Sequence, residues 1–429
     1  MCLIGIFLFE HACSIIAGML ITHRVALDPT NKQKALFRQH AGFARFAWNR
    51  CLEESRRALD AGEAGATSQY RLRRFFNSVK GEIAPWSGSL SQNAAKYALV
   101  GLGEAWGRFW SELNKTRRVG TKCHVRPPRF KSRKRSVQAF RADNGPGTVK
   151  CRGKIVRLPR IGKVRMREAC RFEGVVRECT VKHDGVRWHA VVVFDVVEPE
   201  TKSEGACVGV DAGLRWLATV HDGESVEVIA NPRPLKAALG KLRSVNRRIA
   251  RSLRIHGRKS RSNRRERMYA QRRRLYVRVR SLRFEVAHKA TTAIAKRSRL
   301  VCVESLNVSG WMRNRRLARS TADASPSRFL SLLKWKCRRE GVRLVEAGRF
   351  YPSSKTCSSC GKVNAGLGMD HRWRCPSCGV VHDRDANASL NLRRQGLAAD
   401  VEGVSDGRKA AVPVEASTRQ ISSHQCGSA

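Results

Sequence analysis

Two CxxC pairs in the C-terminal part of the sequence constrain the fold of this chain more than any other feature. Residues 361–374 separate the first pair, Cys357 and Cys360, from the second, Cys375 and Cys378, and a glycine follows each pair. This is the spacing of a zinc ribbon, in which each pair places two thiolates on one tight turn. Because four cysteines leave the metal no open position, we expect a structural zinc site.

Other possible zinc ligands lie in the same segment. His371 and His382 could each replace a cysteine, but we interpret them as ordinary polar residues of the ribbon. The other 11 of the 15 cysteines are scattered along the chain, and the total is odd. This pattern argues against a secreted disulfide scaffold and favours a reducing compartment.

The charge of the chain points to a polyanionic partner. Its 84 Lys and Arg residues face only 35 Asp and Glu residues, which gives a formal net charge of +49. Such an excess is typical of nucleic-acid binding, in which phosphate contacts dominate the affinity. Charge alone does not separate an enzyme from a histone-like or ribosome-like basic protein.

Three acidic residues stand out in so basic a chain. Asp211 ends the apolar run at residues 206–211, and Glu304 ends a second apolar run. Asp385 precedes a helix-forming segment. Acids at the ends of buried strands are costly unless a cation satisfies them, and carboxylates that hold a pair of divalent ions can cleave phosphodiesters. Taken singly, Asp211 also fits a simple turn, and Asp385 fits a helix N-cap.

A basic, proline-punctuated segment at residues 115–136 has little periodicity, so we expect a loop. It is a candidate for phosphate contact, although such a run is also typical of a solvated face. Its candidate nucleic-acid-binding residues are Arg126, Arg129, Lys131, Arg133, Lys134 and Arg135.

The ordered motifs GVDAG, VCVESLNV, PSSKTCSSCG, the second CxxC pair and HDRDANASLNL resemble those of the TnpB family. The segments LDPTNKQKALFRQHAGFARFAWNR and PPRFKSRKRS extend the resemblance over roughly residues 22–394. TnpB proteins are transposon-associated RNA-guided DNA nucleases related to the type V CRISPR effectors. The resemblance identifies Asp211, Glu304 and Asp385 as the catalytic acids that hold Mg²⁺ or Mn²⁺. Asp383 is then a supporting or solvated residue.

The resemblance implies a multi-domain α+β protein. Its parts are an RNase H-like (RuvC-like) α/β nuclease domain with a zinc-ribbon insertion, a β-barrel wedge domain and a helical recognition lobe. The expected boundaries are a first wedge strand at 19–29, the recognition lobe at 30–115, the wedge domain at 116–200, the nuclease domain at 201–352 with a basic helical segment at 233–298, the zinc ribbon at 353–381 and the last part of the nuclease domain at 382–395.

The two ends of the sequence receive separate predictions. Residues 1–18 are apolar but lack a basic start and are interrupted by Glu10 and His11, so we expect a translated upstream extension with the working start near Met19. Each of its apolar runs is too short to span a membrane. Residues 396–429 are poor in aromatic residues, and we expect a disordered tail.

The function that the resemblance implies is RNA-guided, metal-dependent cleavage of DNA next to a short adjacent motif. Guide RNA and target double-stranded DNA are the expected partners of a monomeric ribonucleoprotein in the cytoplasm, associated with the nucleoid and with no membrane. Two alternatives remain, a nuclease-silent RNA-guided DNA-binding regulator and a basic RNA-binding zinc-ribbon protein. The presence of all three acids favours the enzyme.

Overall fold

The computed structural model describes residues 18–63, 67–133, 136–143, 147–257, 262–368 and 370–402. The predicted upstream extension, apart from its last residue, and the part of the predicted tail beyond residue 402 lie outside these ranges. The chain divides into two compact units, which we describe separately. Unit 1 contains the described residues of 1–200 and 232–286, and unit 2 those of 201–231 and 287–429. None of the described helices is long and apolar enough to cross a membrane.

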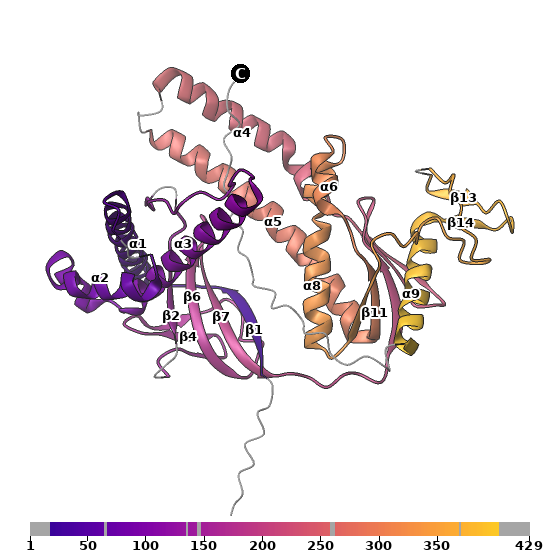
Figure 1. Cartoon of the computed structure of the whole chain (residues 1–429), viewed down its shortest axis with the longest axis horizontal. Helices are drawn as coiled ribbons and strands as arrows, with labels where there is room; N and C mark the ends of the chain where they lie inside the picture. Colours follow the sequence, from indigo (N-terminus) through magenta and orange to yellow (C-terminus); the bar gives the residue numbers. More distant parts are fainter. Residues whose placement is uncertain are drawn as a thin grey trace, which may run out of the picture. The chain divides into compact units, whose positions relative to one another are not determined.

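Three long helices form the first part of unit 1 (Figure 1). They are α1 (Asn31–Asp60), α2 (Gln69–Ile83) and α3 (Asn93–Val119), with a short 3₁₀ helix η1 (Pro85–Ser89) between the last two. The α1 helix begins at a capping box, in which Thr30 and Gln33 each accept a hydrogen bond from the backbone of the other. The helical part ends with α3 at Val119, slightly beyond the boundary of the recognition lobe expected at residue 115.

Two antiparallel sheets complete the β part of unit 1. The first has the strand order β1-β7-β6-β2 and the second β3-β4-β5. Their bounds are β1 Gly18–Ala26, β2 Ala139–Asp143, β3 Lys150–Arg152, β4 Ile155–Leu158, β5 Gly162–Arg165, β6 Val175–His183 and β7 Trp188–Val197. A hairpin at Asp184 and Gly185 joins β6 to β7. One hydrophobic core runs through helices and strands, with Phe37, Phe43 and Phe194 almost fully buried.

A pair of basic helices follows in the sequence, α4 (Pro234–His256) and α5 (Asn263–Arg297). Val245 and Ile249 of α4 pack with Met268 of α5 in a small core of their own. Our sequence-based division places residues 233–298 wholly in the nuclease domain. In the structure, α4 and α5 up to Val286 group with unit 1, and only the end of α5 belongs to unit 2.

Unit 2 is built on a five-stranded mixed sheet of order β10-β9-β8-β11-β12. The strands are β8 (Ala206–Asp211), β9 (Trp216–His221), β10 (Val226–Ala230), β11 (Ser298–Glu304) and β12 (Arg343–Ala347). The strands β8, β11 and β12 are parallel, and β9 and β10 continue the sheet in antiparallel order. The helices α8 (Pro326–Arg339) and α9 (Arg384–Glu402) lie on opposite sides of this sheet (Figure 1).

The remaining elements of unit 2 are short. They are α6 (Val308–Arg313), α7 (Ala318–Ala324) and the hairpin of β13 (Arg372–Arg374) and β14 (Val381–Asp383). The α9 helix continues to Glu402, so the prediction of a disordered tail from residue 396 is wrong for residues 396–402. Packing explains the difference, because α9 lies against the central strands and Arg299 and Arg343 both pair with Asp400 near its end.

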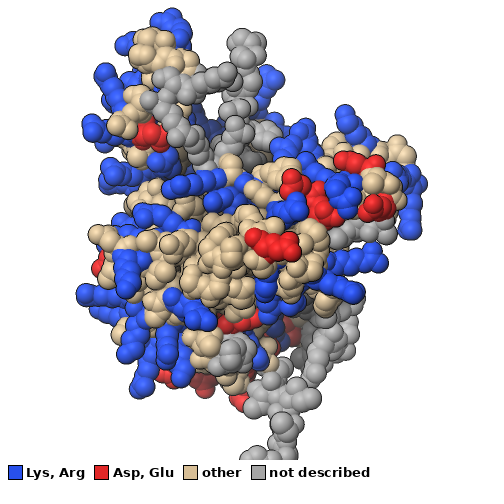
Figure 2. Space-filling view, turned by 90° about the vertical axis from the view of Figure 1, so that its left-hand side faces the viewer, with Lys and Arg blue, Asp and Glu red and all other residues tan. Residues whose placement is uncertain are grey.

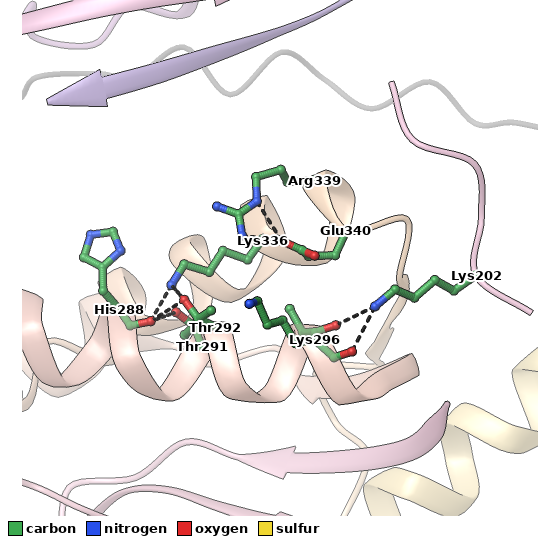
Figure 3. Close-up of polar contacts among 9 residues, drawn as sticks. Lys202, His288, Thr291, Thr292, Lys296, Lys336, Arg339 and Glu340 are labelled. Atoms are coloured by element: carbon green, nitrogen blue, oxygen red, sulfur yellow. Dashed lines mark hydrogen bonds and ion pairs between the residues drawn. The ribbon is translucent and has the colours of Figure 1, made fainter. Parts of the chain in front are cut away.

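Two lysines fix the C-terminal end of α5 within unit 2 (Figure 3). Lys336 of α8 is buried and donates hydrogen bonds to the carbonyl oxygen of His288 and to the hydroxyl of Thr292. Lys202 donates to the carbonyl oxygens of Ala295 and Lys296 at 3.3 and 3.0 Å. Positively charged side chains near the C-terminal carbonyl groups of a helix are stabilising. These contacts therefore stabilise α5, which leads directly into β11.

Candidate metal centres and nucleic-acid interface

The three predicted catalytic acids come together at one edge of the unit 2 sheet. Asp211 is the last residue of β8 and Glu304 the last residue of β11. These strands are parallel neighbours, and Val210 pairs with Val303, so the two acids stand side by side at the carboxyl ends. Asp385 reaches the same place from the first turn of α9. Elements far apart in the sequence thus supply three half-buried carboxyl groups to one location.

The electrostatics of this site reveal uncompensated negative charge. Burial, with the nearby charges of Glu304 and Asp385, raises the pKa of Asp211 to about 8. Burial also raises the pKa of Glu304, and burial together with Asp383 raises that of Asp385. A divalent cation satisfies such a cluster, since oxygen ligands are those that Mg²⁺ prefers. The three carboxylates are therefore candidate ligands of a divalent cation by donor type, and their oxygen atoms lie farther apart than the 4.8 Å that encloses the four cysteine sulfurs.

A close approach of helix and strand brings Asp385 to the sheet. A side chain at Gly209 in β8 would collide with the carbonyl oxygen of Ser389 and the backbone nitrogen of Arg393 in α9. Only glycine allows the backbones to meet at this distance. The glycine of the GVDAG motif thus has a packing role, two residues before Asp211.

The N-cap of α9 is Asp383, and Asp385 does not take this role. The Oδ1 atom of Asp383 accepts hydrogen bonds from the backbone nitrogens of Asp385 and Ala386 at 3.0 and 3.1 Å. The sequence alone leaves Asp385 as a possible cap and Asp383 as a solvated or supporting residue. Since α9 begins at Arg384, Asp383 occupies the capping position and the carboxylate of Asp385 remains available.

Two arginines that our sequence analysis did not single out accompany the acids. The positive charge of Arg384 opposes the rise in the pKa of all three acids, and that of Arg215 opposes the rise in the pKa of Asp385. Arg384 also donates a hydrogen bond to the carbonyl oxygen of Gly368 at 2.8 Å. The available signal was proximity in sequence, because Arg384 adjoins Asp385 and Arg215 follows the GVDAG motif. Both cations are placed to attract a phosphate group.

The four predicted zinc ligands form a compact cluster. Among the described residues they are the only group of three or more candidate ligands whose donor atoms all lie within 4.8 Å of one another. The Sγ atoms of Cys357 and Cys378 lie 3.6 Å apart, and those of Cys360 and Cys375 lie 3.7 Å apart. A tetrahedral zinc with Zn–S bonds of about 2.3 Å requires sulfur separations of about 3.8 Å. The thiols therefore fit zinc without rearrangement.

Each cysteine pair sits on a turn that ends in a left-handed glycine. Gly361 and Gly379 have φ angles of 76° and 72°, and each donates a backbone hydrogen bond to the first cysteine of its pair. Of the two histidines, His382 approaches the cluster, with Nε2 3.1 Å from the Sγ atom of Cys357. Its ring also packs on Trp373. His382 thus supports a ligand from outside the four-sulfur set.

Side chains of α9 tie the first zinc turn to the helix that carries Asp385. Asn387 accepts from the backbone nitrogen of Ser358 at 2.9 Å and donates to the carbonyl oxygen of Thr356 at 2.7 Å. Asn391 donates to the same carbonyl and to that of Ser353. Buried amides that bond fully in this way fix a geometry. The ribbon and the start of α9 are therefore one rigid piece.

The basic loop in unit 1 is held firmly against α1. Trp48 donates a hydrogen bond to the carbonyl oxygen of Arg129 at 3.0 Å. The amide of Asn49 forms two hydrogen bonds with the backbone of Lys131, at 2.8 and 2.9 Å. Arg56 donates to the carbonyl oxygen of Pro128. Side chains of α1 thus hold the loop in place, although α2 and α3 lie between them in the sequence.

The predicted nucleic-acid contacts in this loop differ in exposure. Lys131 is half-buried, with its Nζ atom 3.3 Å from the centre of the Trp48 ring, and burial lowers its pKa to about 8. Arg126, Arg129 and Arg133 are exposed. Lys134 and Arg135 lie outside the described residues. Elsewhere too, Lys and Arg side chains far outnumber acids on the face drawn in Figure 2.

Models of three protein families match the chain. They are "Cas12f1-like, TNB domain" at residues 327–392, "Probable transposase" at 186–315 and "Helix-turn-helix domain" at 19–64. The first match includes all four zinc-ribbon cysteines and Asp385. In the described part of the third match, the structure has the strand β1 followed by the single long helix α1.

Known proteins resemble the chain over most of its length. A Mycobacterium tuberculosis protein named "Putative RNA-guided DNA endonuclease" is 32% identical, covering 86% of this chain and 85% of that protein. InsQ of Escherichia coli, with the same descriptive name, is 25% identical over 87% and 91% of the two chains. A solved mini-RNA-guided endonuclease, CRISPR-Cas_phi3, aligns over 89% and 93% with a TM-score of 0.44 and 10% identity. The chain belongs to the TnpB family.

Proposed function

We propose that this chain is an RNA-guided, metal-dependent DNA endonuclease encoded by a transposon-type element. The observation that carries the proposal is the placement of Asp211, Glu304 and Asp385 at one sheet edge, where burial and the charges of Glu304 and Asp385 raise the pKa of Asp211. The names of the full-length relatives support the same activity. A protein that only bound RNA would have no use for three clustered carboxylates in a chain of net charge +49.

The domain assignments form part of this proposal. Unit 2 is a RuvC-like nuclease domain of RNase H fold, a reading supported by its mixed five-stranded sheet flanked by helices. The two antiparallel sheets of unit 1 form the β-barrel wedge domain, and α1 to α3 form the recognition lobe. Backbone hydrogen bonds from Asp28 to Arg165 and from Arg167 to Ala26 join these sheets, as closure into a barrel requires.

Asp211, Glu304 and Asp385 would hold Mg²⁺ or Mn²⁺. Such ions, when bound, activate a water molecule and stabilise the leaving oxygen of the phosphodiester. The other residues act by position and charge. Asp383 caps the first turn of α9 and so fixes the position of Asp385. Arg384 and Arg215 attract the DNA phosphate to the acidic edge, by which we mean the sheet edge that carries Asp211, Glu304 and Asp385. The zinc site stays structural.

Guide RNA and target double-stranded DNA are the proposed partners of a monomeric ribonucleoprotein in the cytoplasm, associated with the nucleoid. In this mode of recognition, base pairing reads the sequence, whereas the protein reads backbone shape and a short adjacent motif. Neutralising both an RNA scaffold and a heteroduplex accounts for the large positive charge.

A cleavage assay tests the proposal. The ribonucleoprotein is purified with its own RNA, the RNA is sequenced, and a duplex that matches its guide segment beside a randomised flank is added with Mg²⁺ or Mn²⁺. We expect cleavage by the wild type and by Glu224→Gln, an exposed acid outside the site, and none by Asp385→Asn. Tight guided binding without cleavage under either metal would instead identify a nuclease-silent regulator, and absence of guided binding would overturn both readings.

A further inference from the structure

A groove of about 500 Å³ opens in unit 1 between α1 and η1, and the proposed nuclease chemistry does not use it. Its wall on the α1 side comes from residues spaced three or four apart, which share one face of a helix. Trp86 of η1 forms the other side. The lining residues that matter here are Gln39, Gly42, Arg45, Phe46 and Trp86.

The floor of the groove is open because α1 has a glycine there. Gly42 lies in the middle of a long helix, where glycine is destabilising relative to alanine. Its backbone does not require glycine, since the nearest atom to an added Cβ would be the Nη2 atom of Arg45, at 3.8 Å. A side chain at this position would occupy the groove. The glycine therefore lowers helix stability and keeps the space free.

An exposed but fixed aromatic ring borders this space. Trp86 keeps 50% of its surface exposed, although its ring makes edge contacts with Phe43 and Phe46 at centroid distances of 5.6 and 5.7 Å. A rigid exposed indole is a surface on which a planar ring can stack.

Positive charge lies beside the ring. Arg45 is half-buried and makes no hydrogen bond or ion pair within the described part of the chain. Burial, together with the positive charge of Arg133 in the basic loop, lowers the pKa of Arg45. A guanidinium group binds phosphate with a matching geometry, and a second cation that acts on the same place adds to the attraction for an anion.

We propose that this groove binds an unpaired nucleotide of the guide RNA. Its base stacks on Trp86, the amide of Gln39 meets the base edge, and Arg45 and Arg133 bind the adjacent phosphate. The inference that the nucleotide belongs to RNA rests on the proposed function. A folded RNA always presents splayed bases in its loops and bulges, whereas the target DNA exposes single-stranded bases only after the guide has begun to pair with it.

Filling the groove tests this directly. Gly42→Leu places a side chain in the space and replaces glycine with a better helix former, so the protein stays folded. Gly107→Leu is the matched control, because Gly107 is exposed in α3 with no atom within 4 Å of an added Cβ. Trp86→Ala and Trp86→Phe test stacking. The probe is a fluorescent single-stranded oligoadenylate, titrated onto the full chain at several salt concentrations.

We expect Gly42→Leu and Trp86→Ala to weaken binding about tenfold, with Trp86→Phe close to wild type. Their plots of log affinity against log salt should keep the wild-type slope, because no phosphate contact is lost, whereas Arg45→Ala should flatten the slope by about 0.7. Equal affinities of Gly42→Leu and Gly107→Leu would overturn the proposal, even where guided DNA cleavage is intact.

Ultraviolet cross-linking identifies the occupant in the ribonucleoprotein. With its own RNA and a matched duplex both present, a ribonucleotide adduct on the peptide that carries Trp86 is the expected result, and Gly42→Leu should abolish it. A deoxyribonucleotide adduct at this peptide would overturn the RNA assignment. A wild-type protein that retains no RNA at all would count against the proposed function itself.

Discussion

The carboxylate of Asp383 accepts a hydrogen bond from the backbone nitrogen of Asp385 at 3.0 Å. One aspartate thus caps α9 while the other, two residues later, points its own carboxyl group to the acidic edge shared with Asp211 and Glu304. Because the roles are divided, helix stability and metal chemistry can be perturbed separately by single substitutions.

Asp383→Ala should lower the free energy of unfolding by about 1 kcal/mol, the usual cost of losing an N-cap. Asp383→Asn should remain close to wild type, since asparagine caps equally well. Asp385→Asn should abolish cleavage without loss of stability, because it removes a negative charge from a cluster that has too many. Urea unfolding and the cleavage assay measure both effects. Unfolding of Asp385→Asn with a stable Asp383→Ala would show that the caps had been assigned the wrong way round.

Some features of the site follow from the sequence alone. The spacing of the two CxxC pairs predicts the four cysteines as zinc ligands, and their Sγ atoms come together in the structure. Asp211 and Glu304 each end an apolar run, and parallel strands bring their carboxyl ends to one edge. The Thr30–Gln33 capping box at the start of α1 likewise depends only on residue type and local spacing.

Other features depend on contacts that sequence cannot provide. The sequence suggests Asp385 as a possible N-cap, and only the observed start of α9 at Arg384 assigns that role to Asp383. Lys131 reads as a solvated or phosphate-binding lysine until the fold brings Trp48 beneath it. Composition predicts disorder after residue 395, but ion pairs to Asp400 from the sheet extend the helix.

The zinc ribbon should respond differently to loss of a ligand and loss of its support. Cys375→Ser should release zinc and slow cleavage, because the first zinc turn is bonded to α9 through Asn387 and Asn391. His382→Ala should retain one zinc per chain but weaken its affinity about 10- to 100-fold. Elemental analysis and chelator competition measure these changes, with Cys123→Ser as the control outside the ribbon. Zinc retained in full by Cys375→Ser would refute the ligand set.

The salt dependence of RNA binding should distinguish the exposed cations of the basic loop from the packed one. Arg129→Ala and Arg133→Ala should each flatten the plot of log affinity against log salt by about 0.7 to 0.9, as expected for one lost phosphate contact. Lys131→Ala should leave that slope unchanged and lower the melting temperature, because it removes the packing on Trp48. Guide-RNA binding at several salt concentrations, with thermal unfolding in parallel, gives both readouts. A flattened slope for Lys131→Ala alone would contradict this division of roles.

Acid should destabilise unit 1 through His189, which lies on β7 with its Nδ1 atom 3.7 Å from the carboxylate of Asp184. Burial, together with the nearby charges of Arg24 and Arg280, lowers the pKa of His189 to about 4 against the opposing effect of Asp184. In the unfolded chain the pKa returns to about 6.5. Between these values the unfolded state binds the extra proton, so stability falls as the pH is lowered from 6.5 towards 4.

His189→Gln should remove one titrating group and reduce the slope of the free energy of unfolding against pH by at most about 1.4 kcal/mol per pH unit. Other histidines whose pKa is lowered by burial contribute to the remaining slope, among them His23, His40 and His183 in unit 1. Urea unfolding of the full chain across this pH range, monitored by tryptophan fluorescence, compares the two proteins. Identical slopes would mean that His189 takes up its proton in the native state as readily as in the unfolded one.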